Sequence, residues 1–434
     1  MEFKTFDQVI SYMESFTNLE KRTDKYSNRT YRLDRMHALM ETLGHPERCY
    51  RTIHVAGSKG KGSTASYIAS GLKALGYVTG LYMSPHVSDY RERFTLCGRF
   101  VDDSILIETG NELASSLEGF CFTDDIGDSE PTTFELYTAF AFLLFKRLGC
   151  QWAVIETGLG GRLDATNILL PEASVITPIE LEHTEILGGT IELIATEKSK
   201  IIKQYRPSFS AFQSSEALSV IKAEAKAVSS EFHYLGDYVS SVTETSIVFK
   251  DGYSASLDLA MKGLVQMQNC ALAILVLRNL GLYREGKTEA ALESNTLPGR
   301  MELVQWKRPL YLDGAHTKNS MDALIKTFRN IYPGRGGVCI FGAVSGKNHL
   351  AMAQSVLSAF DTVVISRPGT FKKNDPAALY ELVVSLKKPS QTVVLREDAS
   401  SALAYSLEHC EQDQGILCAG SFYLAGAIKE ALCL

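Results

Sequence analysis

The stretch HVAGSKGKGSTA at residues 54–65 alternates two lysines with glycines and continues into a serine and a threonine. An apolar run, RTIHVAG, ends at Gly57, and a segment with helical periodicity follows at 61–76. Glycines let the backbone N–H groups of such a loop turn toward an anion, and the positive end of the next helix points at the same place. Lys61 is then placed to reach the outer phosphates of a nucleotide.

The spacing of this loop departs from the common phosphate loop, G-x-x-x-x-G-K-[ST]. Val55 stands at the position of the first glycine, and Gly62 separates Lys61 from Ser63. The order of strand, glycines, lysine, hydroxyls and helix still suits phosphate binding. The alternative interpretation is a glycine-rich turn with solvated lysines.

Polar side chains stand at the ends of two further predicted strands. Glu156 begins the stretch ETGLGGRLDATN at the end of a buried run, and Ser84 ends VTGLYMS and begins the tripeptide SPH. Ligands bind at the carboxyl ends of strands in open α/β sheets, and magnesium prefers oxygen donors together with phosphate. Glu156 is therefore a candidate magnesium ligand, with a surface acid in a glycine-rich turn as the alternative.

A histidine and a lysine stand out in the stretch 179–203. His183 follows another strand end, where it is either a ligand or a structural residue. Lys198 lies on the next predicted helix among apolar residues, where a half-buried lysine usually extends its charge to solvent. The convergence of polar residues at four strand ends is a stronger signal than any single one: Lys61, Ser84, Glu156 and His183.

Short apolar runs rich in β-branched residues alternate with helical segments, which favours an α/β fold with a parallel sheet. Residues 231–260 alternate polar and apolar and contain an Asp-Gly turn, which predicts a small antiparallel hairpin. We expect an N-terminal P-loop-type, doubly wound, mostly parallel sheet with a small antiparallel β edge. Its expected strands lie at 51–57, 78–84, 152–158 and 173–179, and its expected helices at 61–76, 132–149, 191–203 and 264–281.

The Pro-Gly pair in TLPGR, 296–300, is the best linker candidate. We predict a first domain at 1–295 and a second, Rossmann-like α/β domain at 301–434. The expected strands of the second domain lie at 309–315, 337–344, 361–368, 391–397 and 415–421.

The composition argues against several classes of protein. The net charge is −6 and no basic run exists, which argues against nucleic acid or an anionic membrane as a partner. The nine cysteines form no CxxC pair, which argues for reduced thiols in a cytoplasmic protein and against a zinc site or a disulfide framework. The longest apolar run, in 134–145, is too short to cross a membrane, and the N-terminus is too charged for a signal peptide.

The loop GSKGKGS resembles the GTNGKGS loop of the Mur-ligase superfamily. The ordered set SPH, TFELYTAFAF, ETGLGGRLDATN, PGRMEL and DGAH resembles the folylpolyglutamate synthase/dihydrofolate synthase family, and GLGGRLDATN is specific to this branch. The match runs from YRLDRM near residue 31 to GSFYLAG at 420–426. It implies an ATP-binding central-type domain, a glutamate-ligase domain, and ATP-dependent addition of L-glutamate to folates through an acyl phosphate.

The resemblance also implies roles for matching residues. Those implied to bind ATP are Gly57, Ser58, Lys59, Gly60, Lys61, Gly62, Ser63, Asn269, Arg300, Asp313 and His316. Ser84 and Glu156 would hold one Mg²⁺, and His183 a second. The catalytic residues would be Lys61, Lys198 and His183, with Lys198 carbamylated so that an anion lies near the metal. Phe134 and Asp164 would bind folate, and Ser421 would bind glutamate.

Several residues depart from the family pattern, although every implied metal ligand is kept. These departures leave open the substrate preference and the geometry of ATP binding. They are Lys59 in place of asparagine, Glu180 and Glu182 in place of glycine and aspartate, Lys200 in place of glycine, Val265 in place of histidine, and DGAHTKNS in place of DGAHNP. They motivate one alternative, an inert nucleotide-binding regulator derived from the ligase. A Mur-type cell-wall ligase is a second alternative, against which stand GLGGRLDATN and the lack of an extra N-terminal domain for UDP recognition. The loop spacing argues against a P-loop kinase or motor ATPase.

The sequence leaves open whether dihydropteroate, folate or both accept the glutamate, and the family expectation favours both. The expected partners are small molecules only, and the expected oligomeric state is a monomer.

We predict that Lys61→Ala abolishes turnover and leaves the fold intact, because the loop would lose the cation that faces the outer phosphates. Steady-state kinetics and circular dichroism of the variant test this expectation. A variant with normal activity would refute the role of Lys61.

Overall fold

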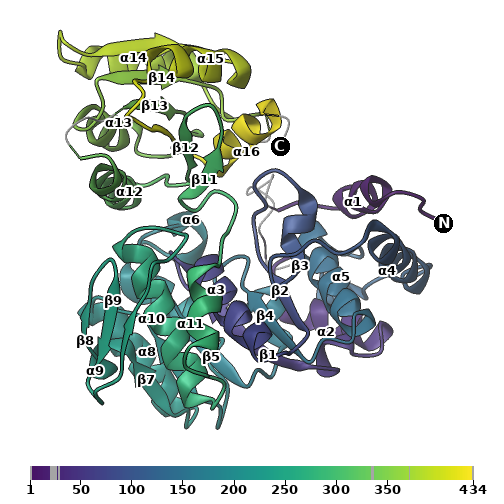
Figure 1. Cartoon of the computed structure of the whole chain (residues 1–434). Coiled ribbons are helices and arrows are strands. Elements are labelled where there is room, and N and C mark those ends of the chain that lie inside the picture. The colour runs from purple at the N-terminus through teal and green to yellow at the C-terminus, as the bar shows by residue number, and fades with distance from the viewer. Residues whose placement is uncertain (1, 20–26, 28–29, 334–336, 371, 433–434) are drawn as a thin grey trace. The chain divides into compact units, whose positions relative to one another are not determined.

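The computed structural model of the chain describes residues 2–19, 27, 30–333, 337–370 and 372–432. The chain forms two compact units (Figure 1). Unit 1 consists of 1–85, 90–259 and 266–295, and unit 2 consists of 86–89, 260–265 and 296–434. No sequence pattern indicated that the two short segments, 86–89 and 260–265, belong with the C-terminal part of the chain.

The described residues of unit 1 form a main sheet of seven strands in the order β3-β2-β4-β1-β5-β6-β7. Neighbouring strands are parallel except β2 and β3, which are antiparallel. The expected mostly parallel sheet is therefore confirmed. Its strands are β1 Arg51–Ala56, β2 Thr79–Tyr82, β3 Phe94–Leu96, β4 Trp152–Glu156, β5 Ala173–Ile176, β6 Ser208–Ser210 and β7 Phe232–Tyr234.

The helices expected after β1, before β4 and after β5 are present. They are α3 Lys61–Ala74, α5 Thr133–Arg147 and α7 Ile191–Ser199, the last ending before the expected residue 203. A capping box between Thr132 and Glu135 begins α5. The helix expected at 264–281 is also present, as α10 Leu264–Asn279. The remaining helices described up to residue 293 are α1 Phe6–Glu14, α2 Leu33–Thr42, α4 Asp103–Ser116, α6 Thr184–Leu187, α8 Ser215–Ala227, α9 Leu235–Tyr238 and α11 Lys287–Glu293.

The antiparallel element predicted within 231–260 is larger than a hairpin. In the described residues it is a separate sheet of three strands, β8 Val239–Val242, β9 Ser246–Phe249 and β10 Ser254–Ser256. The Asp-Gly turn joins β9 to β10, and Gly252 has a φ of 92° there. The first residues of the predicted stretch instead form β7, because they pair with β6 in the main sheet.

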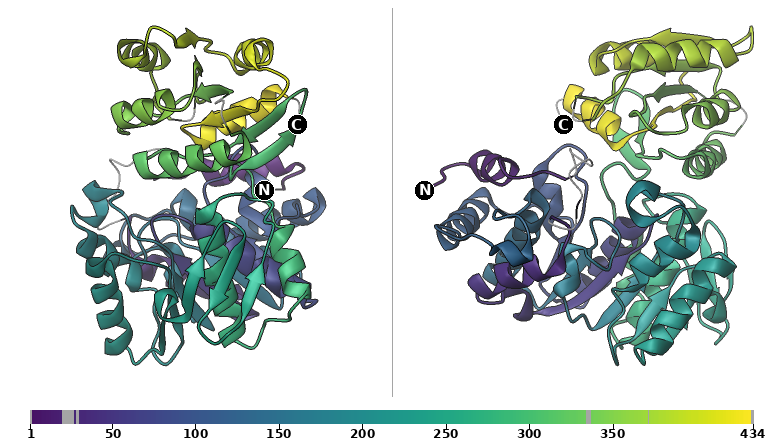
Figure 2. Two further views of the ribbon diagram at one scale, coloured as in Figure 1. Left: turned by 60° about the vertical axis from the view of Figure 1, so that its left-hand side comes forward. Right: turned by 180° about the vertical axis from the view of Figure 1, so that it is seen from behind.

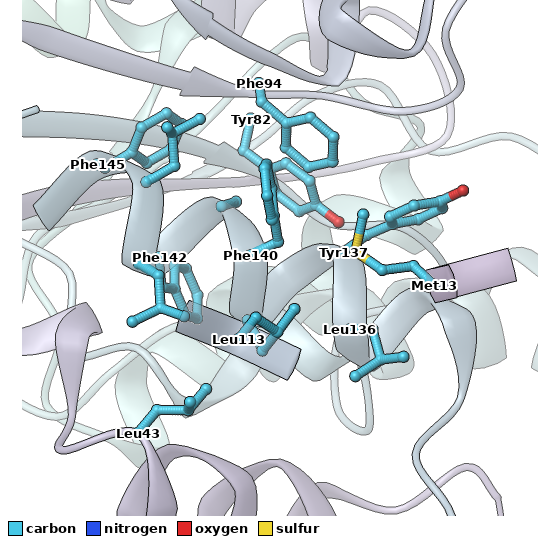
Figure 3. Close-up of a cluster of buried hydrophobic side chains, with 14 of the residues drawn as sticks. Met13, Leu43, Tyr82, Phe94, Leu113, Leu136, Tyr137, Phe140, Phe142 and Phe145 are labelled. Atoms are coloured by element: carbon cyan, nitrogen blue, oxygen red, sulfur yellow. The ribbon is translucent and has the colours of Figure 1, made fainter. Parts of the chain in front are cut away.

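Helix α5 contributes most of its residues to a large apolar cluster of unit 1 (Figure 3). Phe140, Phe142 and Phe145 are fully buried, and Phe140 packs edge to face on Phe94 of β3 with ring centroids 4.9 Å apart. The helix is apolar on nearly all sides because α1 and α4 cover it and because Phe140 and Phe145 pack on β3 and β2 of the sheet. Within the described part of the chain, no helix is long and apolar enough to span a bilayer.

Unit 2 contains, in its described residues, a sheet of six strands in the order β11-β12-β16-β13-β14-β15. Its five expected strands are confirmed, and β11 is an additional strand that pairs antiparallel with β12. The strands are β11 Glu302–Gln305, β12 Pro309–Leu312, β13 Val338–Phe341, β14 Thr362–Ile365, β15 Thr392–Leu395 and β16 Ile416–Ala419. The helices are α12 Lys318–Ile331, α13 His349–Leu357, α14 Pro376–Leu386, α15 Ala399–His409 and α16 Phe422–Ala431.

Helices cover both faces of the sheet in unit 2 (Figure 2). Successive residues of a strand point to opposite faces, and β13 illustrates this alternation. Cys339 and Phe341 join the cluster with α12, α13 and α14, whereas Val338 and Ile340 join the cluster with α15 and α16. The layers are those of a Rossmann-like α/β domain, as expected.

We predict that Leu144→Ala on α5 lowers the free energy of unfolding of unit 1 by about 2–5 kcal/mol, since Leu144 is fully buried and leaves a cavity. Leu170→Ala is the matched control, because Leu170 is 77% exposed, and its effect should stay within about 0.5 kcal/mol. Native-state hydrogen exchange of the α5 amides measures both changes. Equal effects of the two variants would contradict the assignment of α5 to the core.

Candidate active site

The order of the central strands brings four loops of unit 1 to one edge of the sheet. β2, β4, β1 and β5 are neighbours and run parallel, so their carboxyl ends lie side by side. Ser84 follows β2, Glu156 ends β4, the glycine-rich loop follows β1, and residues 177–183 follow β5. This is the edge at which open α/β sheets bind ligands.

The glycine-rich loop is held against the neighbouring strand end. The backbone N–H groups of Ser58 and Lys59 both donate to the carbonyl oxygen of Pro178, at 2.9 and 3.1 Å. Gly60 has a φ of 80°, and a Cβ there would lie 2.4 Å from Oδ1 of Asn269. The loop therefore requires glycine and contacts Asn269, and α3 begins directly after it at Lys61. Since the first N–H groups of a helix lack intrahelical partners, this helix end offers donors to an anion.

Glu156 and Lys61 form the charged centre of this edge. The Glu156 carboxylate is 5% exposed, and its Oε1 lies 3.9 Å from the Lys61 ammonium. Its Oε2 accepts from the backbone N–H of Ser84 at 3.3 Å. A Cβ at position 62 would lie 3.3 Å from the same oxygen, so Gly62 makes room for the carboxylate. Three of the four predicted strand-end segments thus meet at Glu156.

The donors near Glu156 fit a magnesium ion better than a transition metal. One buried carboxylate and the nearby serine offer oxygen donors, which Mg²⁺ binds together with phosphate. In the part of the chain that the structure describes, no cluster of three or more His, Cys, Asp or Glu residues could hold a metal. Phosphate oxygens would therefore have to complete the coordination of any ion bound here. His183 precedes α6 with a φ of 48° and an exposed side chain, and its role as a ligand stays a prediction.

Lys198 is buried directly beneath the loop. It is 2% exposed, and its ammonium donates to the carbonyl of Gly57 at 2.8 Å and to Oε1 of Glu182 at 3.1 Å. Burial lowers the pKa of Lys198 to about 8, and the positive charge of Lys61 contributes. The interpretation of Lys198 as a lysine that extends its charge to solvent is therefore wrong, because the ammonium points into the protein.

Glu182 is a site residue that the sequence did not predict as such. Its second carboxylate oxygen lies 3.8 Å from the ammonium of Lys59, so the carboxylate lies between two lysines. Burial alone would raise the pKa of Glu182, but Lys61, Lys198 and Lys59 together lower it to about 2. The available signal was the position of Glu182 next to His183, at the end of a strand.

The Asp164 carboxylate organises the GLGGRLDATN loop from within. It accepts from the N–H groups of Leu159 at 2.8 Å and Thr166 at 3.0 Å, and from the Thr166 hydroxyl. That hydroxyl also lies 2.8 Å from Nε2 of His54 on β1, and burial lowers the pKa of His54 to about 3. The oxygens of Asp164 are thus used inside the protein. Its implied contact with folate stays a prediction.

Phe134 rests on the same loop. A Cβ at Gly158 would lie 2.2 Å from the Phe134 ring, so the ring packs directly on the backbone there. Tyr31, which the sequence did not predict as a site residue, donates its hydroxyl to the carbonyl of Leu159 at 2.6 Å. The buried guanidinium of Arg35 pairs with Glu135 at 2.9 Å, next to Phe134 on α5. These contacts hold the GLGGRLDATN loop and the start of α5 together beside the candidate site. The stacking role of Phe134 stays a prediction.

A second group of candidate residues meets at one edge of the unit 2 sheet. β11 begins opposite the end of β12, and β16 runs parallel to β12, so the segments before β11 and after β12 and β16 lie together. The structure therefore brings together four predicted residues: Arg300, Asp313, His316 and Ser421.

These residues differ in what their side chains do. Asp313 accepts from the N–H groups of Met301 and Ala315, both at 2.8 Å, and burial raises its pKa against the opposing charge of Arg300. The buried Ser421 caps α16 by accepting from the N–H of Tyr423 at 3.1 Å. Asp313 and Ser421 thus shape the backbone, and their ligand contacts stay predictions.

The model of the Mur ligase middle domain matches residues 55–277, and that of the Mur ligase, glutamate ligase domain matches residues 299–422. The chain belongs to the Mur ligase family. It is 34% identical over 345 residues to the dihydrofolate synthase/folylpolyglutamate synthase of Bacillus subtilis, which covers 76% of this chain and 79% of the relative. The resemblance to the folylpolyglutamate synthase/dihydrofolate synthase branch of the Mur ligases is thereby confirmed.

Solved structures of this branch share the fold over nearly the whole chain. Mycobacterium tuberculosis folylpolyglutamate synthase complexed with ADP and AMPPCP has a TM-score of 0.85 at 25% identity, covering 98% of this chain and 97% of that one. E. coli FolC in complex with DHPP and ADP has a TM-score of 0.83 at 25% identity, covering 99% and 98%. The α/β fold in two parts is the Mur-ligase fold.

Proposed function

We propose that this chain is an ATP-dependent ligase that joins L-glutamate to folates, and that it also accepts dihydropteroate. The observation that carries the proposal is the pairing of Lys61 with the buried Glu156, at 3.9 Å, where a glycine loop meets the N-terminus of α3. This arrangement suits a metal-bound triphosphate. The named relatives support glutamate as the amine and a folate as the acid.

The reaction needs activation of the acid because a carboxylate is a poor electrophile. The folate carboxylate attacks the γ-phosphorus of ATP, ADP leaves, and an acyl phosphate forms. The amine of glutamate then attacks the acyl carbon, loses a proton and expels inorganic phosphate. Closure of the site against water protects the acyl phosphate from hydrolysis.

Each residue of the edge then has a defined task. The loop from Gly57 to Ser63 would hold the phosphates through its backbone, and Lys61 would neutralise the charge that develops on the γ-phosphate. Lys59 adds a second cation, which Glu182 holds at 3.8 Å. Bound Mg²⁺ would supply further charge neutralisation, with Ser84 and Glu156 as its ligands and His183 as the ligand of a second ion.

A monomer in the cytoplasm, without nucleic acid or membrane partners, stays our prediction for the cellular form. The monomer rests on the family expectation, whereas the cytoplasmic location and the lack of nucleic-acid and membrane partners rest on the composition.

The purified protein should release ADP and phosphate only when ATP, glutamate and an acid are all present. We expect incorporation of labelled glutamate into both dihydropteroate and tetrahydrofolate, offered separately. Absence of glutamate incorporation with either acid would overturn the proposed function.

Glu156→Gln should raise the Mg²⁺ concentration needed for half-maximal activity by at least tenfold, because an anionic ligand is lost.

We also propose that Lys198 forms a carbamate with CO₂. Its neutral amine attacks CO₂ and releases one proton, and only the neutral form reacts. Since the pKa of Lys198 is about 8, roughly a tenth of the amine is neutral at pH 7 and half at pH 8. The carbamate anion would have to part from Glu182, which holds the ammonium at 3.1 Å.

At constant dissolved ¹³CO₂, the carbamate signal in ¹³C NMR should therefore rise severalfold between pH 7 and pH 8. Lys198→Met should abolish the signal. Lys203→Met is the matched control and should keep it, because burial also lowers the pKa of Lys203 to about 8 while its ammonium is bound by Asn167. A signal that survives in Lys198→Met would place the carbamate elsewhere.

A further inference from the structure

We propose that Phe422 is a positioning residue that fixes the Arg300 guanidinium for binding the phosphates of the nucleotide. Phe422 is the first residue of α16 and follows the cap residue Ser421. The inference rests on the proposed function, because it takes Arg300 as a nucleotide contact. Phe422 is not among the residues that the sequence predicted for the site.

The Phe422 ring contacts two candidate residues of unit 2, Arg300 and His316. The central carbon of the Arg300 guanidinium lies 3.9 Å from the ring centroid, which is the distance of direct stacking. The His316 ring meets it edge to face, with centroids 6.2 Å apart. His316 is in turn held by its Nδ1, which lies 2.8 Å from the carbonyl oxygen of Gly314.

The backbone around the ring leaves it little freedom to move. A Cβ at Gly314 would lie 2.0 Å from the Phe422 ring, and a Cβ at Gly299 would lie 3.1 Å from it. The ring therefore fits between two glycine backbones, one in the DGAH segment and one in the PGR segment. This fit requires glycine at position 314, whereas position 299 favours glycine both through the tight contact and through its φ of 63°.

Stacking constrains a guanidinium without using its hydrogen bonds. The N–H groups of arginine point outward in the plane of the group, so a ring below the plane occupies none of them, and Nη1 of Arg300 donates to the carbonyl oxygen of Gly299 at 3.3 Å. A long arginine side chain otherwise loses rotamer entropy when it binds. Phe422 removes part of that loss in advance, so its effect should fall on nucleotide affinity.

A second stacked pair in unit 2 provides the control. Arg396 lies over the Tyr405 ring with its central carbon 4.9 Å from the centroid, and Tyr405 belongs to α15. No candidate site residue takes part in that pair. Tyr405→Leu thus removes an arginine–aromatic contact of the same kind without touching the proposed site.

We expect Phe422→Leu to raise the KM for ATP and the Kd for ADP roughly 3- to 30-fold, the range for a cation–π contact, with kcat changed less than twofold. Phe422→Tyr keeps the ring and should restore both values. Gly314→Ala should reproduce the loss by displacing the ring. Tyr405→Leu should leave both constants unchanged, and circular dichroism should show the same folded state for all four variants.

A double-mutant cycle separates positioning from a general structural role. In an Arg300→Met background, Phe422→Leu should weaken ADP binding by less than twofold further, because its partner is already absent. Additive losses, or a normal Kd in Phe422→Leu, would overturn the inference.

Calorimetry with ADP measures binding and needs no turnover. A chain that binds ADP through Arg300 but joins no glutamate would therefore refute the proposed function and leave this inference standing. ADP binding that does not depend on Arg300 would refute this inference alone.

Discussion

Mutual neutralisation of lysines and carboxylates at one sheet edge is the interaction on which the rest of the site depends. Lys59, Lys61 and Lys198 would repel one another if left alone in a partly buried place. Glu156 faces Lys61, and Glu182 lies between Lys59 and Lys198. The carboxylates therefore allow this density of positive charge to exist before any phosphate arrives.

The parallel sheet makes that charge arrangement possible, because it delivers residues far apart in sequence to neighbouring strand ends. The glycine loop, Glu156 and Glu182 come from the ends of β1, β4 and β5, which are neighbours in the sheet. Polar groups behind the edge are also paired, as with Asp164 inside its loop and Arg35 with Glu135. Such satisfied networks hold loops in one geometry, which charge stabilisation in catalysis requires.

The sequence predicted what short-range patterns determine. Apolar runs predicted the main strands, and the polar residues that follow them predicted the edge of the sheet at which the candidate site residues meet. The partners of buried charges could not be predicted from the sequence. Glu182 meets Lys198 only after the chain folds, and the residue type alone does not show that the Asp164 carboxylate points into its own loop. Phe422 was missed for the same reason, since an aromatic residue at a helix start has no signature until the glycine backbones enclose it. Three-residue strands such as β3 and β6 carry too few residues for a period to emerge.

Gly62 connects the unusual residue order of the loop to its proposed chemistry. With no side chain there, the acid at the end of the adjacent strand can approach the first turn of α3 as closely as it does. A search written for the ordinary phosphate-loop pattern would pass over this chain for that reason. Conversely, an extra glycine inserted between the lysine and the hydroxyl residues of an unfamiliar loop signals that a carboxylate should be sought on the strand beside it.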